Sequence, residues 1–181
     1  ARIQSENRAV INASVLGLIF EKINGYRDGS FFTPGFITMY MCRETLRRAV
    51  LQKFNERYDW DCQNVETDLY NELIRQKIPL QAANTLINSL RICDPAVGSG
   101  HFLVSALNEL IAIKSDLGIL CDPAGKLLPL NALVGNDELI LNDRETDQPI
   151  EYRPGNTVSQ RIQEVLFHEK QTLIENCLFG V

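Results

Sequence analysis

The spacing of apolar residues divides the chain into a helical first half and a mixed second half. Apolar residues at intervals of three and four predict helices over residues 1–23, 34–58, 65–77 and 79–89. The inward-facing residues predicted for the second and third of these helices are Ile37, Tyr40, Met41, Leu46, Val50, Phe54, Leu69, Leu73 and Ile74. Several helices therefore precede the first strand, and we expect them to pack beside a sheet.

The pattern changes after residue 89. The short apolar run that ends at Cys93 predicts a strand, Asp94-Pro95 predicts a turn, and helical spacing resumes at Phe102. The predicted buried face of this helix consists of Phe102, Leu103, Ala106, Leu107, Leu110 and Ile111. Strand, glycine-containing loop and helix together predict the first unit of a parallel α/β sheet, with a ligand pocket at the carboxyl end of the strand.

The predicted helix ends near Gly118, and the next convincing strand is Cys177–Val181, roughly 60 residues later. Connections in regular α/β units are much shorter, so we interpret residues 119–176 as an insertion. Residues 138–142 and 149–153 predict a β-hairpin joined by a long polar turn.

A final helix is predicted between this hairpin and the last strand. Thr157 is its predicted N-cap, and the helix runs to about Glu175. Its apolar positions include Val158, Ile162, Val165, Leu166 and Leu173. His168 lies on this helix, and we interpret it as a surface or core residue without a catalytic role.

Composition is typical of a globular protein of one domain, or of a core with a helical subdomain. The chain has 181 residues, of which 45% are hydrophobic and 23% charged, and no apolar run reaches membrane-spanning length. Its five cysteines form no CxxC pair, and with only two histidines a metal site is not expected. Scattered cysteines favour a reducing, cytoplasmic location. A net charge of −5 excludes a stand-alone DNA-binding domain.

The predicted helix over residues 34–58 is the most basic element. Its basic residues are Arg43, Arg47, Arg48, Lys53 and Arg57. They could contact nucleic-acid phosphates. A solvated charged face with Glu44 and Glu56 as partners is the interpretation that the pattern favours.

The loop after the predicted strand contains residues with distinct physical roles. Gly98 and Gly100 lack Cβ, which permits a sharp turn and a close approach of a ligand to the main chain. The following helix directs its free N–H groups and the positive end of its dipole at the loop. Asp94 offers a carboxylate. The spacing matches neither the dinucleotide fingerprint nor a nucleoside-triphosphate P-loop.

Two segments carry a family resemblance. Residues 94–103, DPAVGSGHFL, resemble the adenosylmethionine-binding motif DPAxGSGxF of the DNA adenine-N6 methyltransferases, and residues 31–34, FFTP, resemble their FYTP segment. Taken alone, Thr33-Pro34 also reads as a helix start. The resemblance implies S-adenosylmethionine as the cofactor. The cofactor-binding residues that it implies are Phe32, Thr33, Pro34, Asp94, Pro95, Ala96, Gly98, Ser99, Gly100 and Phe102.

The resemblance also implies that this chain is a fragment of a larger enzyme. The sequence stops at Val181, where the family continues with an acidic residue, and it contains no Pro-Pro of an NPPY motif. We expect the parent enzyme to flip adenine out of double-stranded DNA and methylate N6. The fragment alone is expected to be inactive and to bind cofactor weakly. Sub-micromolar binding in a titration would contradict this expectation.

The predicted fold is therefore an α/β protein, the start of a Rossmann-like adenosylmethionine-binding sheet. A helical subdomain, residues 1–89, precedes a first βαβ unit, residues 90–181, that contains the insertion. Three functions stay open. The first is a DNA adenine methyltransferase of a restriction–modification or phage-defence system, the second a methyltransferase of another substrate such as protein glutamine, and the third a non-catalytic helical interaction module.

Overall fold

The computed structural model describes residues 33–150 and 155–181, together with positions 19 and 23. The predicted helix over residues 1–23 and most of the loop that follows it lie outside the described residues. The helices are α2 (Gly35–Tyr58), the π-helix η1 (Val65–Leu69), α3 (Tyr70–Arg75), α4 (Leu80–Ile87), α5 (His101–Asp116) and α6 (Thr157–Asn176). The strands are β1 (Ile92–Asp94), β2 (Leu130–Gly135), β3 (Glu138–Asp143) and β4 (Leu178–Gly180).

Helix α2 follows the predicted bounds but buries a different stripe from the one predicted at its start. Its buried residues are Thr38, Cys42, Leu46, Val50 and Phe54, which recur every fourth position. Ile37, Tyr40 and Met41 are exposed instead, so their predicted inward orientation is wrong. The stripe runs through the small residues Thr38 and Cys42, because α5 packs closely there.

The helix predicted over residues 65–77 is divided into η1 and α3. Asn64 caps η1 by accepting a hydrogen bond from the Thr67 N–H at 3.0 Å. Leu69 and Leu73 are buried as predicted, whereas Ile74 is 58% exposed, which the prediction missed. Helix α4 begins after Pro79, as the sequence predicts.

Strands β1 and β4 form a parallel pair, with Cys93 opposite Phe179. This confirms that Cys177–Val181 contains the next strand of the predicted unit. Helix α5 follows β1 in sequence, and of its predicted buried face Ala106, Leu110 and Ile111 are buried, whereas Phe102, Leu103 and Leu107 are only partly buried. Buried polar residues on α5 include His101, Ser105, Asn108, Glu109, Lys114 and Ser115.

The predicted hairpin is found in part, and β3 has a second partner that the sequence did not predict. Strand β3 pairs antiparallel with β2 over its whole length, with Gly135 opposite Glu138. The two-residue turn Asn136-Asp137 has positive φ angles of 51° and 65°, as a type I′ turn requires. On the other edge of β3, Asn142 forms an antiparallel bridge with Pro149, and the Ile150 N–H donates to the Leu141 carbonyl at 2.9 Å, so the predicted pairing is present as far as Ile150. Residues 151–153 lie outside the described residues.

Helix α6 begins at Thr157, one residue earlier than predicted. Asn156, not Thr157, is the N-cap, and its Oδ1 accepts the N–H groups of Val158 and Ser159 at 2.9 and 3.1 Å. The other predicted apolar positions of α6 are buried, but Val158 is 51% exposed and does not join the core.

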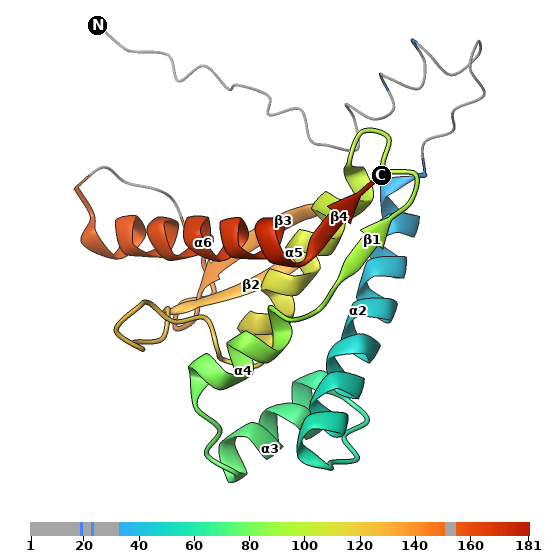
Figure 1. Ribbon diagram of the computed structural model, residues 1–181. Coiled ribbons are helices and arrows are strands. Elements are labelled where there is room, and N and C mark those ends of the chain that lie inside the picture. Colours follow the sequence, from blue (N-terminus) through green and yellow to red (C-terminus); the bar gives the residue numbers. More distant parts are fainter. Residues whose placement is uncertain (1–18, 20–22, 24–32, 151–154) are drawn as a thin grey trace, which may run out of the picture.

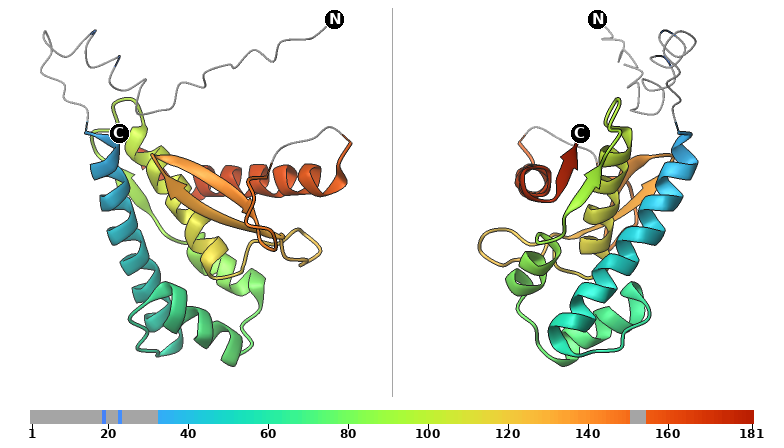
Figure 2. Two further views of the ribbon diagram at one scale, coloured as in Figure 1. Left: turned by 180° about the vertical axis from the view of Figure 1, so that it is seen from behind. Right: turned by 45° about the vertical axis from the view of Figure 1, so that its right-hand side comes forward.

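Helix α5 is the centre of the arrangement, with α2, the β2–β3 hairpin and the β1–β4 pair around it (Figures 1 and 2). The start of α2, the loop after β1 and the end of β4 lie at the same end of the molecule in all views. Within the described ranges, no helix combines the length and apolarity that crossing a membrane requires. The described residues thus form a mixed α/β fold, as predicted, with two small sheets of two strands each.

Candidate functional site: the loop between β1 and α5

The loop after β1 is held in shape by its own residues. One carboxylate oxygen of Asp94 accepts the Ala96 N–H at 3.0 Å, and the Val97 carbonyl accepts the Gly100 N–H at 2.7 Å. Gly98 and Gly100 have φ angles of 50° and 80°, a conformation that side chains with a Cβ rarely adopt. The second carboxylate oxygen of Asp94 is not needed for this turn.

Helix α5 opens directly at this loop. Gly100 is its N-cap, and no side chain of the described residues caps the helix by a hydrogen bond. A Cβ built on Gly100 would meet nothing within 4 Å. The described residues thus leave room around Gly100, and the helix dipole places a partial positive charge at this end of α5.

Strand β4 ends against the same loop. The Val181 N–H donates to the Asp94 carbonyl at 3.0 Å, and the Val97 N–H donates to the Val181 carbonyl at 3.3 Å. A Cβ on Gly180 would lie only 2.7 Å from a Val97 methyl carbon. Glycine at position 180 thus permits the strand to approach the loop closely.

The tip of the β2–β3 hairpin packs beneath the first turn of α5. Oδ2 of Asp137 lies 3.2 Å from Nδ1 of His101, and both side chains are at most 4% exposed. The Ser105 hydroxyl donates to Oδ1 of Asp137 at 2.5 Å. The Asn108 amide donates to the Asp137 carbonyl at 3.4 Å.

Helix α2 contacts the same region from another side. The Cys42 thiol donates to the Phe102 carbonyl at 3.8 Å, and Sγ of Cys42 is buried. Burial, and then the Glu109 and Asp137 carboxylates, raise the pKa of Cys42 to about 12. The thiol therefore stays protonated at neutral pH and is not a nucleophile.

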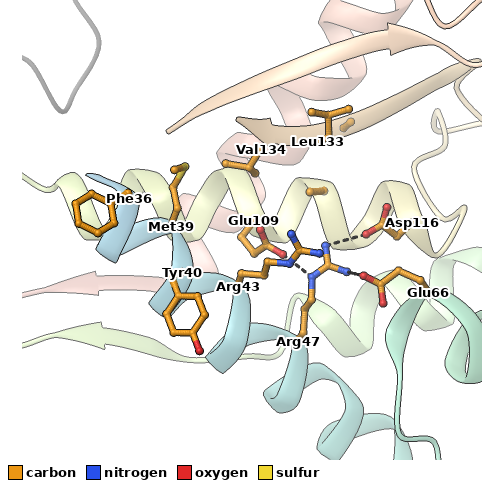
Figure 3. Close-up of a pocket in the computed structure, with 12 residues that line it drawn as sticks. Phe36, Met39, Tyr40, Arg43, Arg47, Glu66, Glu109, Asp116, Leu133 and Val134 are labelled. Carbon is orange, nitrogen blue, oxygen red and sulfur yellow. Dashed lines mark hydrogen bonds and ion pairs between the residues drawn. The ribbon is translucent and has the colours of Figure 1, made fainter. Parts of the chain in front are cut away.

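A cavity of about 410 Å³ lies farther along α5, between that helix, α2 and β2 (Figure 3). Arg47 extends from α2 into it and pairs with Glu109 at 2.7 Å, with Asp116 at 2.8 Å and with Glu66. We call these four residues the Arg47 cluster. Burial raises the pKa of Glu109 and of Asp116 more than Arg47 lowers it.

The basic residues of α2 can now be compared with the two interpretations of this helix, phosphate contact or a solvated charged face. Arg48 pairs with Glu44 at 3.3 Å on an exposed face, as the solvated interpretation predicts. Arg47 departs from both interpretations, because it is an internal ion-pair centre and not a phosphate contact. Its pKa is raised, since the nearby carboxylates outweigh its burial.

The structure places some of the predicted cofactor-binding residues together and leaves others undescribed. The structure brings Asp94, Gly98 and Gly100 into one loop at the start of α5, whereas Phe32 lies outside the described residues. Thr33 is half-buried, and Pro34 is the residue that precedes α2, so the predicted Thr33 cap is not formed. Ligand contacts of the full set stay a prediction; that set comprises Phe32, Thr33, Pro34, Asp94, Pro95, Ala96, Gly98, Ser99, Gly100 and Phe102.

Three residues near the loop were missed by sequence reasoning. Asp137 and Ser105 lie beside His101, and Gly180 lies against Val97. The dipeptide Asn136-Asp137 between two apolar runs was the available signal, since Asn and Asp tolerate positive φ. Ser105 gave no signal, because a lone serine in an amphipathic helix is common.

Comparisons with known proteins identify relatives of this chain. A protein of Methanocaldococcus jannaschii named as a type II restriction enzyme and methyltransferase is 34% identical over 119 residues, 58% of this chain. The adenine-specific methyltransferase BrxX of Escherichia coli is 30% identical over 131 residues, 68% of this chain. Each alignment spans 10% of the relative's length. No family model and no solved structure matches.

Fold and site together define a mixed α/β protein with a glycine-containing loop at the carboxyl end of a parallel strand. The chain is similar to a segment of one protein named as a restriction enzyme and methyltransferase and of another named as an adenine-specific methyltransferase, which confirms the predicted resemblance to adenine-specific enzymes. The predicted restriction–modification connection agrees with the printed name of the archaeal relative.

Proposed function

We propose that this chain is the cofactor-binding part of an enzyme that transfers a methyl group from S-adenosylmethionine to adenine N6 in double-stranded DNA. The observation that carries the proposal is the loop from Asp94 to Phe102. It combines two glycines of positive φ with a helix N-terminus that no described side chain caps, and the chain has relatives named as a restriction enzyme and methyltransferase and as an adenine-specific methyltransferase.

The residues of the loop match the chemistry of this cofactor. The first turn of α5, which no described side chain caps, favours the carboxylate of the methionine part. The free oxygen of Asp94 offers an acceptor for its ammonium group. Gly98 and Gly100 allow the backbone to approach the ligand closely. When bound, the cofactor supplies an electrophilic methyl group, so the task of this chain is to hold and orient it.

The location of Thr33 and Pro34 also supports the proposal. They precede α2 at the end of the molecule where the loop and β4 meet, so a ligand on the loop would have α2 as a neighbour (Figure 1). We propose further that β1 and β4 are the first strands of a Rossmann-like sheet, because they are parallel and the connection between them begins with α5.

Methyl transfer by the full-length gene product tests this function. The protein is incubated with duplex DNA and S-adenosylmethionine, and the DNA is digested and analysed by mass spectrometry. The proposal predicts N6-methyladenine in the wild-type reaction and its loss in Gly98→Val, which adds a branched side chain at positive φ. Methylcytosine as the product would contradict adenine specificity, and methyl groups on protein alone would contradict a DNA substrate.

A further inference from the structure

The hairpin tip beneath the loop is an unusual place for a carboxylate. Asp137 is 5% exposed, although aspartate is almost never buried without partners. Its backbone is left-handed, with a φ of 65°. Burial of a charge and a strained turn both cost stability, so the contacts that this carboxylate makes have to offset them.

These contacts converge on the first two turns of α5. His101, which directly follows the N-cap Gly100, faces Oδ2 of Asp137, and Ser105 donates to Oδ1. The Asn108 amide reaches the Asp137 carbonyl. The backbone N–H of Asp137 lies 2.7 Å from Sδ of Met39 on α2. One turn residue thus links the hairpin, α5 and α2.

The position of His101 makes this contact relevant to the loop. Its main chain is the first helical residue after Gly98-Ser99-Gly100, so its side-chain anchor fixes where the loop joins α5. The contact between His101 and Asp137 restrains the first turn of α5, whose N–H groups lie next to Gly100.

We propose that Asp137 is a positioning residue that holds the cofactor loop in its binding geometry through His101. This inference rests on the proposed function for the identity of the ligand. The inserted hairpin is then part of the cofactor site: it supports the loop from behind, where no ligand contact is made. Asp137 touches neither ligand nor reacting atoms in this account.

The test compares two aspartates of the same hairpin. Asp137→Asn keeps the size of the side chain and removes its charge. Asp143→Asn is the matched control: Asp143 lies at the other end of β3, where its Oδ1 accepts the N–H groups of Glu145 and Thr146. Binding of S-adenosylhomocysteine is measured by NMR titration at a temperature at which circular dichroism shows both variants folded.

The proposal predicts at least tenfold weaker binding for Asp137→Asn and less than a twofold change for Asp143→Asn. His101→Asn preserves a nitrogen near Nδ1 and should bind more tightly than His101→Leu. In the His101→Leu background, Asp137→Asn should have no further effect on affinity, because Asp137 acts through His101. Additive effects in this cycle would show that Asp137 acts by general stabilisation and would overturn the proposal.

A second readout does not depend on the ligand. Amide hydrogen exchange at Gly98, Ser99 and Gly100 is measured in the ligand-free protein, and it should be faster in Asp137→Asn than in Asp143→Asn.

The outcomes distinguish the positioning role from the proposed function. If wild-type protein binds the ligand and Asp137→Asn binds equally well, the positioning role is wrong while the proposed function stands. If wild-type protein does not bind, the proposed function is wrong. The exchange rates then decide the positioning role, and unchanged rates overturn it. If Asp137→Asn does not fold, the His101→Asn and His101→Leu pair carries both readouts.

Discussion

The two ends of α5 hold polar groups in opposite ways. At its C-terminal half, Glu109, Lys114 and Asp116 are paired with charged side chains of other elements, among them Arg47 and Glu169. At its N-terminus, no described side chain caps the helix, and none of the described residues comes within 4 Å of a Cβ built on Gly100. The first arrangement satisfies buried charges inside the protein and joins helices. The second leaves hydrogen-bonding capacity for a ligand, so only the N-terminal end is a candidate binding site.

Lys114→Met should have the largest effect on stability. Lys114 is fully buried and pairs with Glu169, whose side chain is 10% exposed; burial lowers the pKa of Lys114, and the Glu169 carboxylate opposes that shift. Its removal leaves a buried carboxylate unpaired, which costs about 3–5 kcal/mol of unfolding free energy. Urea unfolding measures the loss.

Arg48→Met provides the control for this prediction. Its pair with Glu44 is exposed, so the change should cost less than about 0.5 kcal/mol. Equal losses in the two variants would show that the buried pair is not a structural link between α5 and α6.

Gly180→Ala should have the next largest effect, because the new Cβ would lie 2.7 Å from a methyl carbon of Val97 and 3.0 Å from its Cβ. Overpacking of this kind costs about 1–3 kcal/mol. Val97→Ala should recover part of the loss in the double variant, as thermal unfolding can measure. Gly135→Ala is the control, since its Cβ meets only the flexible end of Ile140 at 2.9 Å. No recovery with Val97→Ala would refute the close approach of β4 to the loop.

Gly100→Ala and Gly155→Ala form a matched pair for the ligand end. Both glycines have positive φ, 80° and 85°, and open space around a built Cβ. Each substitution should cost about 1–2 kcal/mol of stability, because alanine is strained in that conformation. Only Gly100→Ala should weaken binding of S-adenosylhomocysteine, by more than tenfold in an NMR titration. Equal binding by both variants would count against the loop as the ligand site.

The smallest effect concerns pH and the Arg47 cluster. Because burial raises the pKa of Glu109 above its unfolded value, native protein binds more protons, and the contribution of Glu109 to stability rises as pH falls from neutral through the folded pKa. Asp116, Glu66 and Arg43 face the same cavity. In Glu109→Gln, denaturant titrations between pH 7.5 and 5 should show a smaller gain on acidification than in wild-type protein. An unchanged gain would assign it to other groups.

The sequence correctly predicted the elements that are specified by residues close to one another in the chain. The strand, glycine loop and helix from Leu90 to Gly118 combine a β-prone run, two glycines and helical spacing, and the structure agrees. The β2–β3 pairing was missed because the Asn136-Asp137 turn was not recognised as a hairpin turn. The exposure of Tyr40 was missed because an apolar helix position does not reveal which element covers it.

The candidate site likewise contains residues that the sequence could identify and residues that only the fold brings together. Asp94, Gly98 and Gly100 are adjacent in sequence, so a motif can identify them. His101, Ser105 and Asp137 meet only because a hairpin 32 residues beyond Ser105 folds back onto α5. The three carboxylates around Arg47 likewise come from two elements that no local pattern connects.

The most direct test of the account is a chemical-shift map of ¹⁵N-labelled protein titrated with S-adenosylhomocysteine. The loop amides of residues 96–104 and the amides of Gly180 and Val181 should shift in a saturable way, while the amides of Arg47, Glu109 and Asp116 stay unchanged. Shifts confined to the Arg47 cavity, or no shifts at millimolar ligand, would contradict the assignment of the N-terminal end of α5 as the cofactor site.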